Sequence, residues 1–296
     1  MNSILYVTFP LSALLIILLA VGLGIYLTRK FKLSWRLWWI GAATFTLSQV
    51  FHIPFNGYLN NLIGSGVIPL PLMPVQETIA LAVIFGLSAG IFESVARYLA
   101  YRFWAKEARS WPRGLLLGAG HGGIEALFIA LIIAYTFVQM VALREADLSA
   151  IFPPEQLQLA QQQVAGYWST PWHLSLLGAV ERLFTLPLHL ALSVMVLQVF
   201  TRRQIRWLFF AILWHAFVDG FAAVYVPSIF GPLWAEAVLG VLALISIAII
   251  FALRRPEPEP EVAVVPSEAA ASEQADFSLP PVEETDENLD KSRYDQ

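Results

Sequence analysis

The sequence contains no cysteine. This absence excludes disulfide bonds, thiolate ligands for a metal ion and a cysteine nucleophile, and it leaves the redox compartment undetermined. Basic residues are also missing from positions 1–10, ahead of the first apolar run. A cleaved signal peptide is therefore not expected.

Charged residues are scarce, at 14% of the chain, whereas hydrophobic residues make up 57%. This composition excludes an ordinary soluble domain and indicates a multi-pass membrane protein whose surroundings are the lipid bilayer. The segment 256–296 holds 12 of the 22 acids and only 2 of the 18 bases, which leaves residues 1–255 with a net charge of +6. We predict a transmembrane domain over 1–255 and a disordered acidic cytoplasmic tail over 256–296, with no nucleic-acid partner.

Seven segments are apolar over the roughly 20 residues that a membrane helix needs, which predicts an all-α bundle. They are 5–27, 38–59, 77–101, 114–141, 173–200, 207–226 and 233–253. Basic side chains cluster after the first, third, fifth and seventh segments, so the positive-inside rule puts the N-terminus outside and the C-terminus inside.

Other segments are expected at the membrane surface. The glutamine-rich stretch 156–163 predicts a short surface helix in an outer loop, and the loop 60–76 is rich in turn residues. Trp35, Trp38 and Trp39 are typical of an interfacial anchor.

The third segment carries a carboxylate and a guanidinium inside the membrane. Glu93 and Arg97 are four residues apart, so they share one helix face with Gly86 and Gly90. Small residues there allow a second backbone to approach. Ionisable groups within a membrane favour a functional role, although an ion pair that only joins helices is the alternative.

Three further segments place polar groups at a similar depth. These are His121 and Glu125, His189, and His215 with Asp219. A rise of about 1.5 Å per residue puts the histidines and glutamates roughly 10 to 16 Å from the cytoplasmic end. The shared level predicts one polar site in the cytoplasmic half.

Structural roles are the competing interpretation. A membrane histidine can simply bond a backbone carbonyl, and for His189, which follows a helix proline, this is as well supported as a catalytic role. Glu181 and Arg182 favour a structural ion pair. His52 and His173 favour structural or interfacial positions.

Two chemistries fit such a site. A carboxylate in a dry pocket can act as general base on water while neutral histidines donate to the oxyanion of a peptide carbonyl. Alternatively His121, Glu125, His189 and His215 bind zinc, whose water becomes the nucleophile. The sequence lacks His-Glu-x-x-His, the usual helical zinc motif, which lowers the support for the metal.

Several motifs resemble those of known intramembrane proteases. Phe-Glu93-Ser-Val-Ala-Arg97 is similar to the Glu-Glu-x-x-x-Arg motif of the CPBP proteases, relatives of the CAAX prenyl endopeptidase, and His215-Ala-Phe-Val-Asp219 to their His-x-x-x-Asn/Asp motif. Two further features more closely resemble the YhfC branch of that clan. They are Gly-His121-Gly-Gly-Ile-Glu125-Ala, and Glu181-Arg182 with His189 upstream of Ser193. The resemblance covers most of residues 77–226.

The resemblance implies a glutamic-type intramembrane endopeptidase of the bacterial plasma membrane, without a resident cofactor, that cleaves membrane-associated peptides or proteins. It implies Glu93 as the water-activating base, Arg97 as its partner, His121 and His215 as oxyanion donors and Asp219 as an orienting group.

The chain departs from the CPBP pattern at two positions. Ser94 stands where the first motif has its second Glu, and Leu117 stands where a Phe is expected before the middle His. Glu125 is a candidate to replace the missing carboxylate.

Two non-catalytic functions remain open from the residues alone. Histidines on facing helices can ligate haem or bind a lipid headgroup in a carrier protein. A proton-coupled transporter also fits buried carboxylates, but the sequence has no internal repeat that would support one.

Overall fold

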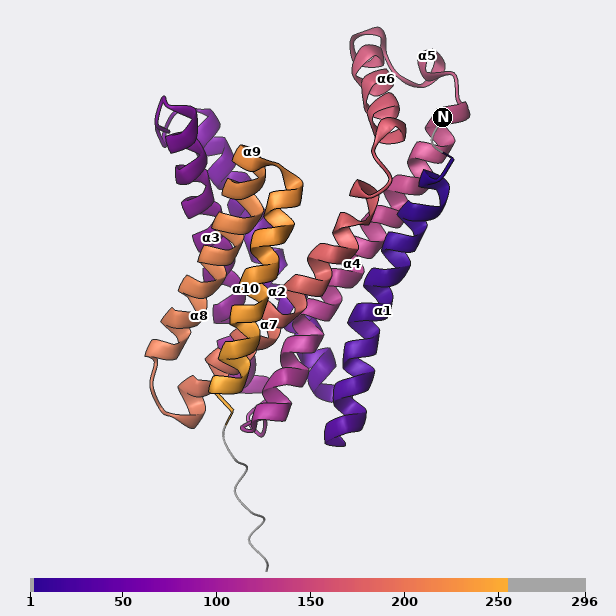
Figure 1. The fold of residues 1–296 in the computed structure, drawn as a ribbon. Helices are drawn as coiled ribbons and strands as arrows, with labels where there is room; N and C mark the ends of the chain where they lie inside the picture. The colour runs from indigo at the N-terminus through magenta and orange to yellow at the C-terminus, as the bar shows by residue number, and fades with distance from the viewer. Residues whose placement is uncertain (1–2, 255–296) are drawn as a thin grey trace, which may run out of the picture. The chain divides into compact units, whose positions relative to one another are not determined.

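The computed structural model describes residues 3–254, which form helices joined by turns and loops, without a β-strand (Figure 1). The all-α prediction is therefore confirmed. The tail predicted to be disordered, 256–296, lies outside the described residues.

The helices follow the predicted segments closely. The long helices are α1 (Leu5–Phe31), α2 (Arg36–Gly64), α3 (Pro74–Leu99), α4 (Trp111–Glu145), α7 (Leu177–Thr201), α8 (Arg206–Phe217) and α10 (Pro232–Ala252). Two π-helical segments, η1 (Ala100–Trp104) and η3 (Val218–Tyr225), continue α3 and α8. The short elements are α5 (Leu148–Ile151), α6 (Pro154–Ser169), the 3-10 turn η2 (Leu174–Leu176) and α9 (Val226–Phe230).

Within residues 3–254, six helical stretches are long and apolar enough to cross a membrane. They include α3 with η1, and α8 with η3 and α9, but not α2. Helix α2 is less apolar because Gln49, His52 and Asn56 lie along it. The count of seven spans and the orientation remain predictions.

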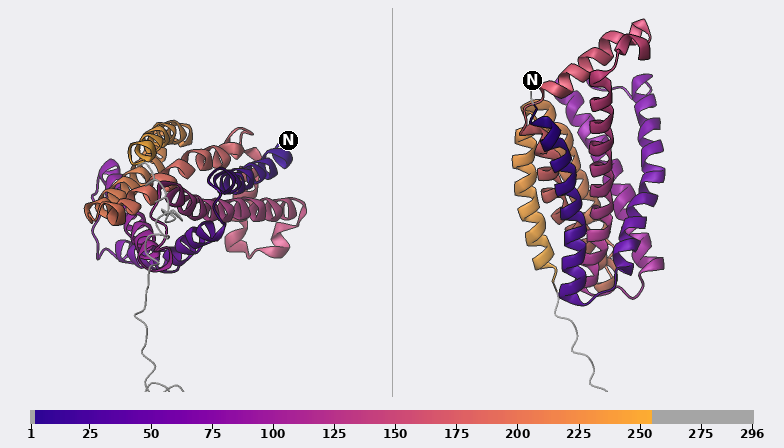
Figure 2. Two further views of the ribbon diagram at one scale, coloured as in Figure 1. Left: turned by 90° about the horizontal axis from the view of Figure 1, so that it is seen from below. Right: turned by 90° about the vertical axis from the view of Figure 1, so that its right-hand side faces the viewer.

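Helices α4 and α7 form the centre of the bundle (Figure 2). Helix α4 packs against α1, α2 and α7, while α3 packs against α2, α8 and η3, and α10 packs against α7. Leu116, Leu117, Leu192, Val194 and Leu197 of the two central helices are buried. Close packing of these side chains brings many atoms into van der Waals contact, and these contacts stabilise the association of the helices.

The connection between α4 and α7 contains more helix than expected. Helix α6 includes the predicted 156–163 and extends it at both ends. The guanidinium of Arg144 lies 4.6 Å from the ring centre of Trp168, whose indole N–H donates to the carbonyl of Met140. These contacts join α6 to the end of α4.

The tryptophan prediction was wrong for Trp38. Trp39 is 62% exposed, as an interfacial residue would be, but Trp38 is only 3% exposed. It is buried because Gly120 and Gly123 of α4 leave room for its backbone and its ring, respectively.

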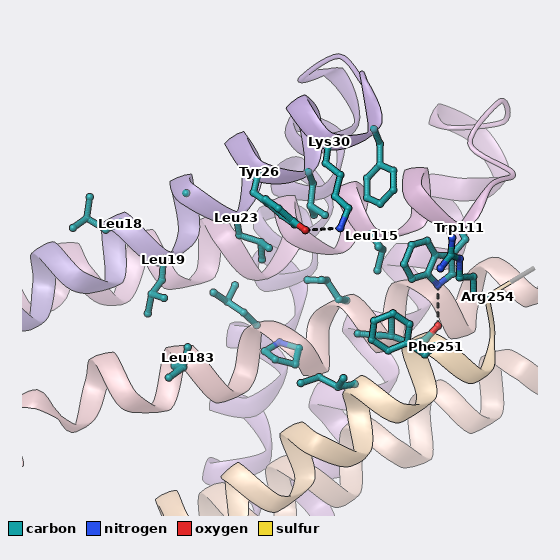
Figure 3. Close-up of a pocket in the computed structure, with 18 residues that line it drawn as sticks. Leu18, Leu19, Leu23, Tyr26, Lys30, Trp111, Leu115, Leu183, Phe251 and Arg254 are labelled. Carbon is teal, nitrogen blue, oxygen red and sulfur yellow. Dashed lines mark hydrogen bonds between the residues drawn. The ribbon is translucent and has the colours of Figure 1, made fainter.

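A groove of about 670 Å³ lies between α1, α7 and α10 (Figure 3). Its walls are mostly leucine, isoleucine and aromatic side chains, and Lys30 and Arg254 lie at one end. None of the predicted site residues lines it. The polar site is thus separate from this apolar groove.

Candidate functional site

Helix α3 brings Glu93 close to α8 through two glycines. A Cβ added at Gly90 would lie 2.5 Å from the carbonyl oxygen of Ile212, and one at Gly86 would meet the carbonyl of Ala216. The two backbones are therefore in contact, as the spacing of these glycines predicted. This contact holds His215 of α8 near Glu93.

The glycine-rich start of α4 has the same effect on two other sides. A Cβ at Gly120 would collide with the carbonyl of Trp38 on α2, and one at Gly122 would lie 2.7 Å from the ring of His189 on α7. Since no side chain separates these helices, the imidazoles of His121 and His189 lie with ring centres 5.6 Å apart.

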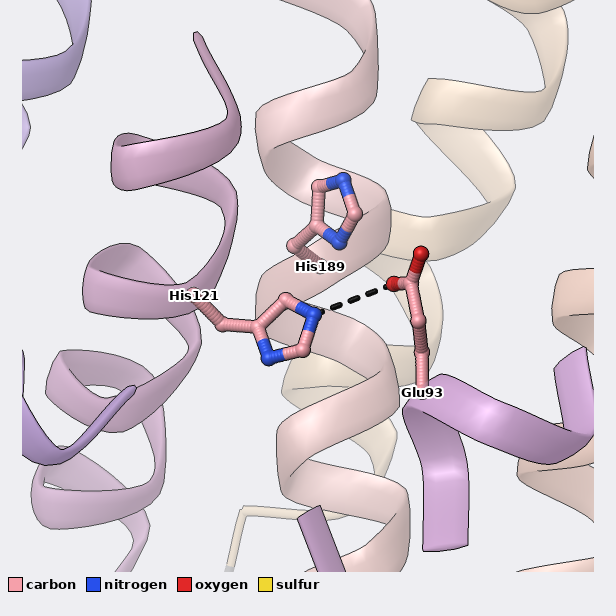
Figure 4. Close-up of side chains that lie close together, drawn as sticks. All are labelled: Glu93, His121 and His189. Atoms are coloured by element: carbon pink, nitrogen blue, oxygen red, sulfur yellow. Dashed lines mark hydrogen bonds and ion pairs between the residues drawn. The ribbon is translucent and has the colours of Figure 1, made fainter. Parts of the chain in front are cut away.

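The carboxylate of Glu93 is the meeting point of the site. Its Oε2 lies 3.0 Å from Nε2 of His121 (Figure 4), 3.6 Å from Nη1 of Arg97 and 3.8 Å from Nε2 of His215. Glu93 is 5% exposed, and the other three residues are at most 1% exposed. Three groups from three helices thus face one buried acid.

A second set of contacts continues from Arg97. Its Nη2 donates to Nδ1 of His189 over 2.8 Å, and Nε2 of His189 lies 2.9 Å from Glu125. Arg182 pairs with both Glu125 and Glu181. The predicted ion pair between Glu181 and Arg182 is therefore present, but Arg182 also reaches the site through Glu125.

The last predicted pair lies at the edge of the site. Nε2 of His215 is 3.3 Å from Oδ2 of Asp219, and the side chain of Asp219 is 35% exposed. Helix α8 changes to the π-helical η3 between these two residues, at Val218, so Asp219 lies in the first turn of η3. Such widened turns are frequent at functional sites, where they change the direction of side chains. All seven predicted site residues therefore belong to one connected group.

Three members of this group have the chemistry of a metal site. One donor atom each from Glu93, His121 and His189 lies within 4.8 Å of the others, and all three residues are buried. Two histidines and one glutamate are a common protein ligand set of catalytic zinc. Nε2 of His121 faces Glu93 (Figure 4), while its Nδ1 is buried without a hydrogen-bond partner, so the proton of the neutral ring can lie on Nδ1 and leave Nε2 as the ligand atom. The residues present thus fit a metal ion, although the set differs from the one predicted, because Glu93 replaces Glu125 and His215.

Sequence analysis did not single out Gln49. Its Nε2 donates to Oε1 of Glu93 over 3.2 Å, and its Oε1 lies 3.2 Å from Nδ1 of His52. His52 in turn contacts Asn56 and Ser88. The spacing of Gln49, His52 and Asn56 on an apolar helix is a signal that could have revealed this polar face.

These observations define a helical multi-pass membrane protein with a buried centre of histidine, glutamate and arginine. The family model described as "YhfC intramembrane metalloprotease" matches residues 15–239, and the chain belongs to this family. It is 29% identical over 259 residues to the "Uncharacterized membrane protein YhfC" of Bacillus subtilis (strain 168), an overlap of 83% of this chain and 95% of that protein. No solved structure matches.

The comparison confirms the resemblance to the YhfC branch and indicates an intramembrane protease in a multi-pass membrane location. The wider CPBP relationship and the roles of single residues remain predictions.

Proposed function

We propose that this protein hydrolyses peptide bonds of membrane-associated substrates, and that Glu93, His121 and His189 hold a catalytic zinc ion. The observation that carries the proposal is the buried group of three donor atoms within 4.8 Å of one another. The description of the family as metalloproteases supports the same choice.

Zinc would lower the pKa of a water molecule so that it loses a proton near neutral pH and becomes a nucleophile for the peptide carbonyl. The chain's own groups would hold the ligands and receive the substrate. Glu125, 2.9 Å from Nε2 of His189, fixes that ring in the way that carboxylates behind metal-binding histidines do. Arg97 and His215, both fully buried beside Glu93, can donate to the oxyanion that forms on the peptide carbonyl.

A metal-free glutamic mechanism is the second candidate. Arg97 favours it, because its guanidinium bonds Nδ1 of His189 and lies 3.6 Å from Glu93, so a cation already faces the carboxylate. In this mechanism Glu93 takes the proton from an attacking water, while His121 and His215 donate to the oxyanion.

The test uses the full chain in proteoliposomes with a pool of single-span reporter proteins. Zinc content, cleavage and cleavage after chelation are measured for the wild type, for Glu93→Gln and His121→Ala, and for Gln139→Leu as a control on an exposed face of α4. We expect one zinc ion per chain, loss of cleavage on chelation and its return with zinc, and neither zinc nor cleavage in the two site variants.

Cleavage that survives chelation but is lost in Glu93→Gln would replace the zinc proposal with the glutamic one. Full cleavage by a folded Glu93→Gln variant would overturn both.

A further inference from the structure

A hydrogen-bonded chain of four uncharged side chains ends on Glu93. Ser88 Oγ donates to Oδ1 of Asn56 over 2.8 Å, and Nδ2 of Asn56 lies 3.0 Å from Nε2 of His52. His52 then contacts Gln49, and Gln49 donates to Glu93, each over 3.2 Å. This hydrogen-bonded chain of side chains runs between α2 and α3 and reaches Oε1 of Glu93, whereas His121 faces Oε2.

The donors in this chain can all be directed toward Glu93. An ionised carboxylate only accepts, so Gln49 presents its NH₂ group to Glu93 and its carbonyl oxygen to His52. That oxygen also only accepts, so Nδ1 of His52 carries the proton. Nε2 of the neutral ring is then free to accept from the amide of Asn56.

Packing holds the ring of His52 in the required plane. It stacks on Phe92, the residue before Glu93, with ring centres 5.3 Å apart and planes at 26°. His52 is 8% exposed and Ser88 is 4% exposed. In such surroundings hydrogen bonds polarise one another, so aligned dipoles favour negative charge at the end of the chain.

We propose that Gln49 is a positioning residue of the proposed peptidase, and that His52, Asn56 and Ser88 hold its amide in the orientation that binds Glu93. Oε1 of Glu93 is thereby fixed by Gln49, and Oε2 stays directed at His121, Arg97 and His215. The inference rests on the proposed function, since it gives Glu93 the central role there.

The hydrogen-bonded chain of side chains also accounts for the polarity of α2. A membrane helix gains nothing from Gln, His and Asn on one face unless they have partners inside the protein, because unpaired polar groups are costly in lipid. Here the partners are Ser88 and Glu93 on α3. The lower hydropathy of α2 is therefore the consequence of a polar face that serves the site.

The experiment compares Gln49→Leu, His52→Leu and His52→Asn with Gln139→Leu, all in the full chain. The amide of Asn can replace the Nδ1 donor of His52 while it lacks the link to Asn56. Zinc affinity is measured by competition with a fluorescent chelator, and kcat and KM by cleavage of a reporter in proteoliposomes.

We expect Gln49→Leu to weaken zinc binding and lower kcat by on the order of tenfold, with KM unchanged, as is usual when a group behind a metal ligand is removed. His52→Leu should act in the same direction, His52→Asn should recover part of the loss, and Gln139→Leu should match the wild type. A folded Gln49→Leu variant with wild-type zinc affinity and kcat would overturn the inference.

Failure of the proposed function gives a different pattern. If the wild type cleaves but binds no zinc, the metal proposal fails, and the change in kcat alone decides the role of Gln49. If the wild type neither cleaves nor binds zinc, the melting temperatures of Gln49→Leu, Glu93→Gln and the double variant decide it. Coupled effects then support the positioning of Glu93 by Gln49, and additive effects overturn it.

Discussion

The guanidinium of Arg97 donates to Nδ1 of His189 over 2.8 Å, and both residues are buried. While Nδ1 accepts from Arg97, the neutral imidazole carries its proton on Nε2, which lies 2.9 Å from Glu125. The zinc ion proposed above would bind Nδ1 in place of the guanidinium. One arginine therefore sets the tautomer of His189 and at the same time faces Glu93. The pairs His121–Glu93 and His189–Glu125 are thus linked through this side chain.

Arg97→Met should destabilise the protein strongly. The substitution leaves Glu93 buried without its nearest permanent cation, and removing one partner of a buried ion pair costs about 3 to 5 kcal/mol. Arg97→Lys keeps the charge but loses the two-pronged contact, so its loss should be smaller. Unfolding in detergent micelles, followed by tryptophan fluorescence, measures the order wild type, Lys, Met. Equal stability of all three would contradict the ion-pair interpretation.

Glu125→Gln and Glu181→Gln separate the two partners of Arg182. Both remove one acid from the same guanidinium, but only Glu125 also contacts His189. We expect kcat for reporter cleavage to fall about tenfold to a hundredfold in Glu125→Gln, because the orientation of His189 is lost. Glu181→Gln should stay within about twofold of the wild type. Similar losses of kcat in both variants would mean that the charge balance around Arg182 lowers kcat, and not the orientation of His189 by Glu125.

Gly90→Ala should disturb the contact between α3 and α8. The added Cβ would lie 2.5 Å from the carbonyl oxygen of Ile212, so the backbones must separate. Overpacking of this kind destabilises by about 1 to 3 kcal/mol, and His215 moves away from Glu93. Gly57→Ala is the matched control, because nothing lies within 4 Å of its added Cβ, and it should stabilise α2 by about 0.5 to 1 kcal/mol. Thermal unfolding of the two variants tests the opposite signs.

The α3–α4 connection supplies a pH-dependent contact outside the site. The backbone N–H of Glu107, and then Arg36 at 2.5 Å, hold the pKa of Glu107 below its ordinary value of 4.5. A lowered folded-state pKa stabilises the fold above the ordinary value, and this contribution is lost as the pH falls through the folded-state pKa. Both side chains are more than half exposed, so the ion pair contributes only about 0.2 to 1 kcal/mol.

Glu107→Gln should therefore lower the melting temperature slightly at neutral pH. Wild type and variant should converge as the pH falls through the lowered folded-state pKa of Glu107, because the carboxylate is then protonated in both the folded and the unfolded state. A difference that persists at acidic pH would show that the effect does not come from the charge of Glu107.

The fold followed from the sequence because lipid imposes a simple condition on backbone groups. A segment of about 20 apolar residues has to be helical to satisfy its own N–H and C=O groups, and each predicted segment coincides with a helix. Trp38 shows where this reasoning stops. A tryptophan near a helix end favours the interface on average, but the glycines of α4 that accommodate it are more than 80 residues away in the chain.

The site was accessible in part for the same reason. Glu93, His121 and His215 stand out because ionisable groups in apolar helices are rare and lie at similar depths. Gln49 did not stand out, because an uncharged amide is less unusual in a membrane helix, and its partner depends on how α2 packs against α3. The placing of Glu93 rather than Glu125 in the group of three possible ligands likewise depends on side-chain directions, which helical spacing leaves open.

The glycine contacts around Glu93 also limit how this centre can diversify. Where Gly86, Gly90, Gly120 and Gly122 meet neighbouring backbones or rings, almost any larger side chain would push whole helices apart. A change in the shape of the centre is therefore easier at its other residues, which leaves the crossings of the helices as they are.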